Sequence, residues 1–259
     1  MKKRTVIIGS LVSLLPMAQS FVVGTGTVLT SSAVILSISR EAKAESAIFY
    51  YNRGIDKKNA GDYYGSISDY TKAIEIDPKD DSAYHNRAVS REYLNQCYAA
   101  ISDYIKAIEI NQDRPTSYHG IGYCKSVLGD YEGAKSAFSK AIELDPTYAS
   151  AYLNRGSVKS DLKDYYGAIA DYTKAIEIKP RESDPYYNRG NAKNELKDDY
   201  GAIADYTKAI EIDSKDKSSY KNRGISKENI GDLKGACSDW RKASSLGDKD
   251  SARWVSNQC

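Results

Sequence analysis

Apolar and small residues recur along most of the chain at spacings of three and four, the period of one helical face. Between positions 166 and 178 they include Ala168, Ile169, Tyr172, Ala175 and Ile176. The same sequence, YGAIADYTKAIEI, stands again at 200–212, which is 34 residues further along the chain. The pattern therefore predicts helices that recur at a fixed interval of 34 residues.

This interval divides residues 47–250 into consecutive blocks. Six blocks follow one another without insertion: 47–80, 81–114, 115–148, 149–182, 183–216 and 217–250. In each block, positions 1–14 suit a first helix, a turn such as Gly129-Asp130 follows, and a second helix comes after it. The Asp of this turn is placed to cap the second helix, and a Pro such as Pro146 ends it. We therefore predict an all-α array of six antiparallel helix pairs.

The blocks resemble the tetratricopeptide repeat family, and the resemblance covers essentially everything after residue 46. The family's marks are an aromatic residue at position 4, a small residue at 8, Ala at 20, an aromatic at 24, Ala at 27 and Pro at 32. In the fourth block these are Tyr152, Gly156, Ala168, Tyr172, Ala175 and Pro180. Gln112, Ser214 and Asp248 stand where Pro is usual, so the resemblance does not predict where those second helices end. It implies a right-handed superhelical solenoid of antiparallel helix pairs that binds proteins.

The first 46 residues differ from the blocks. The basic stretch Lys2-Lys3-Arg4 precedes the uncharged residues 5–39, and Ala42-Lys43-Ala44 follows. This order is typical of an export signal, although the run exceeds the usual apolar core of about 7 to 15 residues. An uncleaved anchor is the alternative, since about 20 apolar residues span a bilayer. Either way the repeats lie beyond the inner membrane, in the periplasm or a lumen, secreted or membrane-anchored. A disordered leader on a cytoplasmic protein is the third possibility.

Composition and motifs narrow the class of function. The chain has 22 Tyr but only 3 Phe and 2 Trp, which suits thin layers where one end of each ring reaches solvent. Residues 45–259 carry 32 basic and 34 acidic side chains, a balance that does not favour nucleic-acid binding. There is no glycine-rich phosphate loop, HExxH or GxSxG motif. We therefore predict neither an enzyme nor a cofactor; an enzyme or glycan-binding protein acting through a groove is the alternative of another class.

Charged residues at positions 7 and 23 vary together. Position 7 is Arg53, Arg87, Arg155, Arg189 and Arg223, and position 23 is Asp69, Asp103, Asp171, Asp205 and Asp239. The third block has Ile121 and Ala137 instead. Because a partly buried charge without a partner is costly, this joint loss predicts that each Arg pairs with the Asp of its own block. We interpret these residues as an internal ion-pair ladder and not as a ligand site.

The first helices carry the candidate binding surface. The resemblance places their positions 2, 5, 6, 9, 12 and 13 on the concave side of the array. Position 6 holds an amide in five blocks, and an amide can both donate to and accept from an extended peptide. The alternative is that Asn is common there in the family whether or not it binds anything. The candidate groove residues are Asn52, His85, Asn86, His119, Tyr123, Asn154, Asn188, Asn191, Lys221 and Asn222.

Histidines and cysteines supply the remaining candidate chemistry. His85 and His119 share position 5 of consecutive blocks and are expected to be neighbouring groove residues. No metal site is predicted, because ligands must lie about 2 Å from an ion while packed helices lie roughly 8 to 10 Å apart. Possible disulfides are Cys237 with Cys259 and Cys97 with Cys124, as outside the cytoplasm such pairs can be oxidised. The alternative is buried thiols at Ala-like positions.

The C-terminal segment 251–259 continues as a short helix whose Trp254 and Val255 are expected to cover the end of the sixth block. Together these patterns predict a non-catalytic scaffold that binds an extended peptide or partner segment in a concave groove. A membrane-anchored assembly or chaperone-like factor for an envelope or membrane complex is the alternative. The two differ in whether residues 5–39 persist in the mature protein, and neither identifies the partner.

Overall fold

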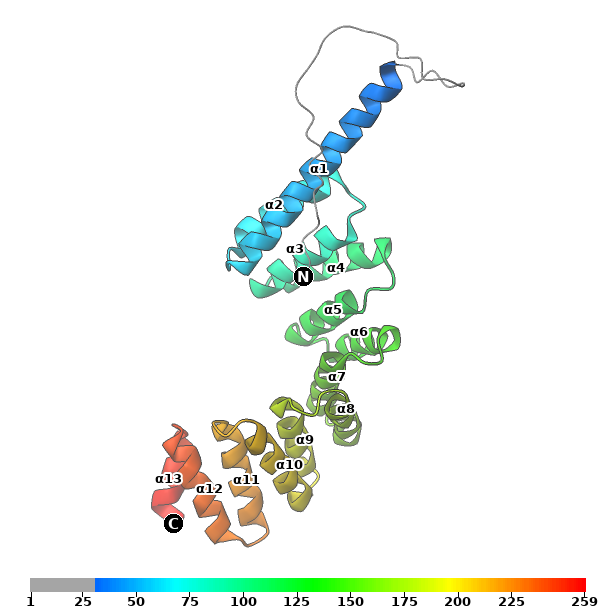
Figure 1. The fold of residues 1–259 in the computed structure, drawn as a ribbon. Coiled ribbons are helices and arrows are strands. Elements are labelled where there is room, and N and C mark those ends of the chain that lie inside the picture. The colour runs from blue at the N-terminus through cyan, green and yellow to red at the C-terminus, as the bar shows by residue number, and fades with distance from the viewer. Residues whose placement is uncertain (1–30) are drawn as a thin grey trace. The chain divides into compact units, whose positions relative to one another are not determined.

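A computed structural model describes residues 31–259, with side chains from Glu41 onward. Within that range the chain forms thirteen helices and no strand (Figure 1). The helices are α1 (Ser31–Asn59), α2 (Tyr63–Ile76), α3 (Asp81–Tyr93), α4 (Cys97–Ile110), α5 (Pro115–Val127), α6 (Tyr131–Leu144), α7 (Ala149–Asp161), α8 (Tyr165–Ile178), α9 (Ser183–Glu195), α10 (Asp199–Ile212), α11 (Lys217–Asn229), α12 (Leu233–Ser245) and α13 (Lys249–Gln258). The predicted all-α repeat array is confirmed.

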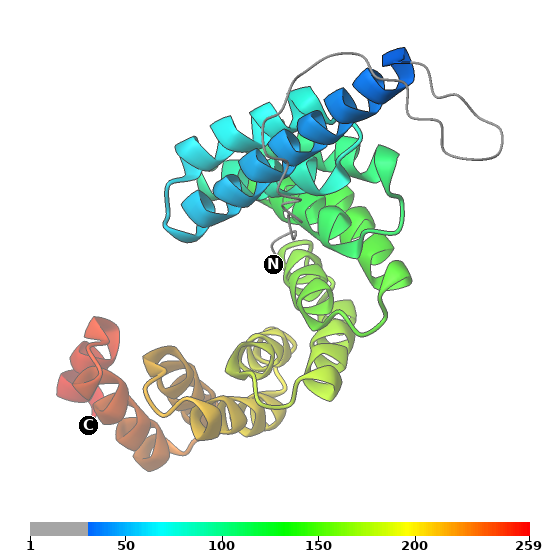
Figure 2. The ribbon, with the colours of Figure 1, turned by 45° about the horizontal axis from the view of Figure 1, so that its top comes forward.

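The array consists of two compact units. The first contains α1–α4 and extends to Gln112, and the second contains α5–α13 and begins at Asp113. Within each unit, every helix packs against the helices that precede and follow it, as the ribbon shows for the second unit (Figure 2). Blocks one and two thus share the first unit, whereas blocks three to six and the C-terminal helix share the second.

The predicted turn chemistry is present between the two helices of most blocks. The side chain of the turn Asp accepts a hydrogen bond of 2.8–2.9 Å from the backbone N–H three residues later. These N-caps are Asp62, Asp130, Asp164, Asp198 and Asp232. Each satisfies a backbone donor that has no partner inside the helix. Block two has Gln96 at the corresponding site, and its side chain makes no capping bond.

Two of the second helices end at the same position with and without proline. α8 is followed by Pro180 and ends at Ile178, whereas α10 has Ser214 in place of Pro and still ends at the equivalent Ile212. Asp248, the third departure, is the N-cap of α13 and accepts a 2.7 Å bond from the backbone N–H of Ser251. The C-terminal helix therefore begins at Lys249, two residues earlier than the expected boundary at 251.

The first helix is longer than the block that contains it. α1 begins at Ser31 and runs past Ala47 without a break, because the residues from Arg40 to Ala47 are mostly good helix formers without Gly or Pro. Of the predicted export signal or anchor, residues 1–30 lie outside the described part of the chain. Among the helices that are described, none combines the length and the apolar character needed to cross a bilayer.

The core is made of one thin layer per block. Its centre is the aromatic residue at position 24, which is 0–2% exposed in every block. A small residue at position 8 lets the first helix approach this ring. At Gly156, for example, a Cβ atom would lie only 2.8 Å from Cε1 of Tyr172, so the close approach requires glycine there. The small and aromatic positions of the repeat pattern are thus the two sides of one helix contact.

All five predicted ion pairs form. Each Arg at position 7 makes two bonds of 2.6–2.9 Å to the two carboxylate oxygens of the Asp at position 23. These carboxylates are only 1–4% exposed. A second cation at position 11 bonds each of them at 2.6–3.0 Å: Lys57, Arg91, Lys159, Lys193 and Lys227. Each buried carboxylate is therefore compensated twice.

The same arginines also connect neighbouring blocks. Nη1 of Arg155 donates to Ser139 Oγ of the preceding block at 3.0 Å, and Arg189 contacts Thr173 in the same way. In the third block, where Ile121 and Ala137 replace the pair, both side chains are nearly buried, at 8% and 9% exposure. The position 11 cation of that block, Lys125, bonds the capping Asp130 instead, at 3.0 Å.

Candidate functional site

The predicted groove residues all lie on first helices, but they are divided between the two units. In the first unit, α1 carries Asn52 and α3 carries His85 and Asn86; in the second, His119 and Tyr123 lie on α5, Asn154 on α7, Asn188 and Asn191 on α9, and Lys221 and Asn222 on α11. Each unit therefore has its own set of candidates.

Two of the amides at position 6 bond to a tyrosine of the preceding block. Asn86 Nδ2 donates to the hydroxyl of Tyr51 at 2.8 Å, and Asn222 Nδ2 donates to the hydroxyl of Tyr187 at 3.2 Å. In each case the partner stands at position 5 of the preceding block. Asn86 is 0% exposed, which corrects its assignment to a peptide-binding surface. Its amide is an internal link, because its donor group already has a partner inside the protein.

His119, at position 5 of the third block, is bonded in the same way by the position 6 amide of the fourth block. Its Nε2 lies 2.9 Å from Nδ2 of Asn154. The ring packs against Phe138 and Tyr148, with centroid distances of 5.4 and 5.0 Å. Burial among these rings lowers the pKa of His119 to about 4, so the imidazole is neutral at physiological pH. His119 is thus a neutral hydrogen-bonding group in the second unit.

The other histidine, His85, lies in the first unit and packs against Tyr104 at a centroid distance of 5.4 Å. Within the described residues, no three side chains of His, Cys, Asp or Glu come together in a way that could hold a metal ion.

The second unit contains a pocket of about 390 Å³, which is lined mainly by its first helices. Two of the predicted residues, Asn191 and Asn222, line it. The other lining residues are Ser160, Tyr165, Asn194, Glu195, Tyr206 and Ile225. They come from three consecutive blocks and include positions 6, 9, 12 and 13, which agrees with the inner face that the repeat pattern implies. In this pocket two of the predicted groove residues meet around a space.

Hydrogen bonds hold the amides of this pocket in place. Asn191 Oδ1 accepts from the hydroxyl of Tyr206 at 2.8 Å and from Nδ2 of Asn222 at 3.0 Å. Asn194 Nδ2 donates to Ser226 Oγ at 2.8 Å and to Asp199 Oδ1 at 3.1 Å. Because burial raises the pKa of Tyr206, its hydroxyl stays protonated and remains a donor to Asn191.

One wall of the pocket carries a carboxylate. Glu195 is at position 13 of the fifth block, and its Oε2 lies 3.5 Å from the hydroxyl of Tyr165 on α8. Glu195, Tyr165 and Asn194 are not among the groove residues that the sequence predicts. The available signal was the i, i+3 spacing of Asn191 and Asn194 on one helix, which places both amides on the same face.

Lys221 and Tyr123 do not line the pocket. The Lys221 ammonium lies 3.6 Å from Asp248 and 3.9 Å from Asp250, two acids that flank the start of α13. Tyr123 on α5 is 39% exposed. Lys221 therefore interacts with the C-terminal helix, and the pocket has no lysine among its lining residues.

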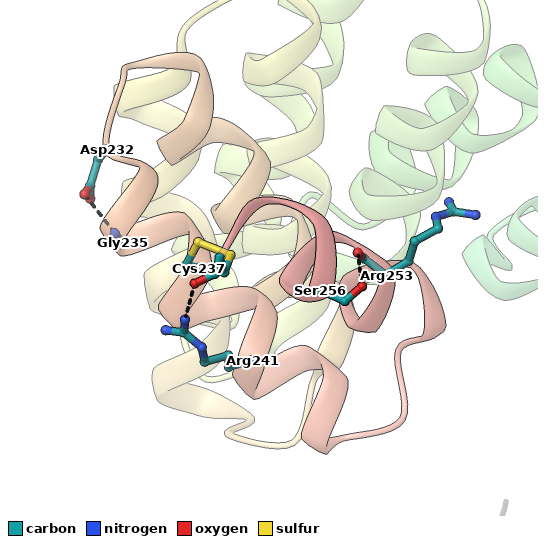
Figure 3. Close-up of a disulfide and its surroundings, with 7 residues drawn as sticks. Asp232, Gly235, Cys237, Arg241, Arg253 and Ser256 are labelled. Carbon is teal, nitrogen blue, oxygen red and sulfur yellow. Dashed lines mark hydrogen bonds between the residues drawn. A yellow bond between two sulfur atoms is a disulfide. The ribbon is translucent and has the colours of Figure 1, made fainter.

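The C-terminal helix is attached to the last block by a disulfide. Cys237 on α12 is bonded to Cys259, with 5.7 Å between the two Cα atoms (Figure 3). Arg241 donates to the backbone oxygen of Cys259 at 3.2 Å, and the Trp254 ring lies 5.2 Å from that of Trp240. The expected cover of block six by Trp254 is therefore present, together with the terminal disulfide.

The other possible disulfide is not formed. Cys97 and Cys124 are free and buried, at 3% and 0% exposure. Cys97 begins α4 in the first unit, and Cys124 lies within α5 in the second. Each fills a small interior position of its own unit, which corresponds to the alternative reading of these residues as buried thiols.

Family models match one stretch of the first unit and three overlapping or adjacent stretches of the second. A model described as "Tetratricopeptide repeat" matches residues 149–182, and another with the same description matches 47–80 and 183–216. A model described as "TPR repeat" matches 128–162. No match was found among the curated proteins.

Solved structures with the same fold extend over most of the chain. MamA is 26% identical, with a TM-score of 0.60 over 66% of this chain and 93% of its own. YrrB, described as a TPR protein with an unusual peptide-binding site, is 23% identical, with a TM-score of 0.62 over 72% and 97%. PilF of Pseudomonas aeruginosa is 17% identical, with a TM-score of 0.71 over 83% and 99%. At such identities the last two likenesses concern the fold alone.

Proposed function

Because this chain belongs to the tetratricopeptide repeat family, we propose that it is a protein-interaction scaffold that binds an extended peptide segment in the pocket of its second unit. The observation that carries the proposal is the meeting of three consecutive first helices, α7, α9 and α11, around one polar space. Its volume of about 390 Å³ is within the range of about 300 to 1,000 Å³ that is usual for ligand pockets. YrrB, which shares this fold, has a peptide-binding site by its own description.

The groups around the pocket suit a peptide. The amide oxygen of Asn191 accepts hydrogen bonds from two donors, and these bonds fix the orientation of the whole amide group. The amino group of Asn191 has no hydrogen-bond partner among the described residues. A peptide backbone presents N–H and C=O groups in alternation, so it can satisfy both this donor and neighbouring acceptors. The lining contains one carboxylate and no histidine or cysteine, which supports a role in binding without catalysis.

We further propose that the repeats act outside the cytoplasm. The disulfide between Cys237 and Cys259 supports this location, because such bonds persist mainly in oxidising compartments. The mass of the protein isolated from its own cells decides between a cleaved signal and a retained anchor. Loss of residues 1–44 fits cleavage after Ala42-Lys43-Ala44, while retention of residues 5–39 in a membrane fraction fits an anchored assembly factor. Recovery of the whole chain from the cytosol would contradict both.

A steric block tests the binding proposal. Peptides are first selected by the full-length chain from a random library with acetylated and amidated ends. Ser160→Trp, which places an indole in the pocket, should weaken their binding by at least about tenfold, as measured by fluorescence anisotropy. Ser126→Trp is the matched control, because Ser126 stands at the same position of block three and does not line the pocket. Equal binding to both variants would mean that this pocket is not the peptide site.

A further inference from the structure

The pocket offers more hydrogen-bond acceptors than donors, and this follows from how its amides are already bonded. Both Asn194 and Asn222 direct their amino groups to neighbours: Asn194 to Ser226 and Asp199, and Asn222 to Tyr187 and Asn191. Within the described structure, the carbonyl oxygens of Asn194 and Asn222 accept no hydrogen bond. The internal network thus uses the donors of these two amides and leaves their acceptors for a ligand.

Glu195 adds a negative charge to these acceptors. No Lys, Arg or His of the described residues forms an ion pair with it. Two lysines stand two residues from Glu195 in sequence: Lys193 is bonded to Asp205 at 2.8 Å, and Lys197 lies in the turn after α9. By contrast, glutamates near the ends of the second helices, such as Glu177 and Glu211, pair with a lysine three residues earlier at 2.6–2.7 Å. Glu195 is therefore a carboxylate that faces a polar space without a countercharge.

The surrounding first helices extend this charge bias. Inner-face positions of α7, α9 and α11 carry Asp161, Asp184 and Glu228 in addition to Glu195. Lys221 is the basic residue at these positions, and it lies beside Asp248 and Asp250. The potential along this face therefore favours a positively charged ligand.

We propose that the pocket recognises a basic side chain, Lys or Arg, of the extended peptide, with Glu195 as its ionic partner and the carbonyl oxygens of Asn194 and Asn222 as its neutral acceptors. An ammonium or guanidinium group carries only donors, so it complements a site whose free groups are mostly acceptors. The amino group of Asn191 is left for a backbone carbonyl of the same peptide. This inference rests on the proposed peptide-binding function and names the side chain that the pocket selects.

The loss of peptide affinity should differ between a variant that removes only the ion pair and a peptide that lacks the cation and all of its contacts. Glu195 is exposed, and an exposed ion pair alone changes affinity by roughly fivefold or less. Removing the cation removes the hydrogen bonds to all acceptors as well, so the loss should be larger, at least about tenfold. The two substitutions, one on the peptide and one on the protein, therefore have different expected outcomes.

The test uses the full-length chain and the selected peptides described above. Each peptide is remade with its Lys or Arg replaced by norleucine, and a further peptide has no basic residue but a free N-terminal amine, which separates a side-chain cation from a terminal one. Binding should fall at least about tenfold with norleucine and about fivefold with the isosteric Glu195→Gln variant. Glu228→Gln is the matched control: Glu228 adds to the charge of the same face but does not line the pocket, so binding should fall by less than in Glu195→Gln.

The possible results separate the two proposals. If binding is blocked by Ser160→Trp but is insensitive to norleucine and to Glu195→Gln, the pocket binds peptides and the preference for a cation is wrong. If the peptide with a free N-terminal amine and no basic residue binds as tightly as the selected peptides, the cation need not be a side chain and the side-chain assignment is wrong. If no peptide is selected at all, the proposed function fails, and this inference fails with it.

Discussion

The amides of Asn222 and Asn191 bond to each other across two neighbouring repeats, with 3.0 Å between Nδ2 of Asn222 and Oδ1 of Asn191. The hydroxyl of Tyr206 donates to the same oxygen at 2.8 Å. Because both contacts hold the Asn191 oxygen, its amino group is oriented before any ligand arrives. Such prior ordering reduces the entropy that binding must remove, and it makes Asn191 the residue through which the pocket is most sensitive to change.

Replacing Arg155 by Leu should destabilise the fold. The change removes two bonds to Asp171 and one to Ser139, and it leaves a nearly buried carboxylate with Lys159 alone. We expect the free energy of unfolding to fall by about 3 kcal/mol in urea denaturation followed by circular dichroism, the lower end of the cost of breaking a buried pair, because Lys159 remains.

The chain supplies the control for this substitution. Block three has Ile121 and Ala137 at the two positions, so the double variant Arg155→Ile with Asp171→Ala copies a natural solution. It should lose less stability than Arg155→Leu, because no carboxylate stays buried with an incomplete set of partners. An Arg155→Leu variant with unchanged stability and lost peptide binding would instead identify a ligand site.

His119 should make the protein less stable as the pH falls. Its pKa in the folded protein is lowered to about 4 from an ordinary 6.5, so protons bind more tightly to the unfolded chain. Its contribution is fully present above pH 6.5 and is lost as the pH falls towards 4, by up to about 3 kcal/mol.

Thermal or urea unfolding across this pH range measures the effect. The decrease in stability between pH 6.5 and 4 should be smaller in His119→Phe than in the wild type. His85→Phe, the other histidine variant, tests whether the change in pH dependence is specific to His119. An identical pH dependence in His119→Phe and the wild type would show that the folded-state pKa of His119 is not lowered.

Reduction of the terminal disulfide should lower the melting temperature. The bond closes a loop with a sequence separation of 22, for which the loss of chain entropy in the unfolded state corresponds to about 3 kcal/mol. The variant Cys259→Ser should melt at the temperature of the reduced wild type and should not respond to reductant. A thiol assay on the denatured, unreduced protein should find two thiols, those of Cys97 and Cys124; four would contradict the disulfide.

The periodic features of the fold could be predicted because they recur in several blocks of the sequence. Six copies reveal the helix pairs, the Asp caps and the pairing of Arg155 with Asp171, since the third block lacks both partners together. Residues at the same position of each block can be compared with one another. When two positions lose their charged residues in the same block, the comparison indicates that the two residues are in contact. The repeat pattern predicts the start of α13 two residues too late, because Asp248 occupies the position of Pro in other blocks but serves as the N-cap of this helix.

Only two of the eight pocket residues were predicted, for a different physical reason. Asn191 and Asn222 were identified, but whether an amide faces a ligand or a neighbour depends on side-chain directions that spacing does not give. Asn86 illustrates this, because its bond to Tyr51 places it in the interior. Contacts between residues about 35 apart, such as Tyr187 with Asn222, decide which amide groups stay available, and they become visible only when two adjacent repeats are packed together.

The most direct test of the pocket is the dissociation constant of a selected peptide for the Asn191→Ala variant. Asn191 carries the oriented amino group, so its loss should weaken binding by about tenfold or more while the far-ultraviolet circular dichroism spectrum stays unchanged. Tyr200→Ala is the control, since Tyr200 is 74% exposed on α10 and does not line the pocket, and it should bind like the wild type. Equal dissociation constants for the wild type, Asn191→Ala and Tyr200→Ala would contradict peptide binding in this pocket.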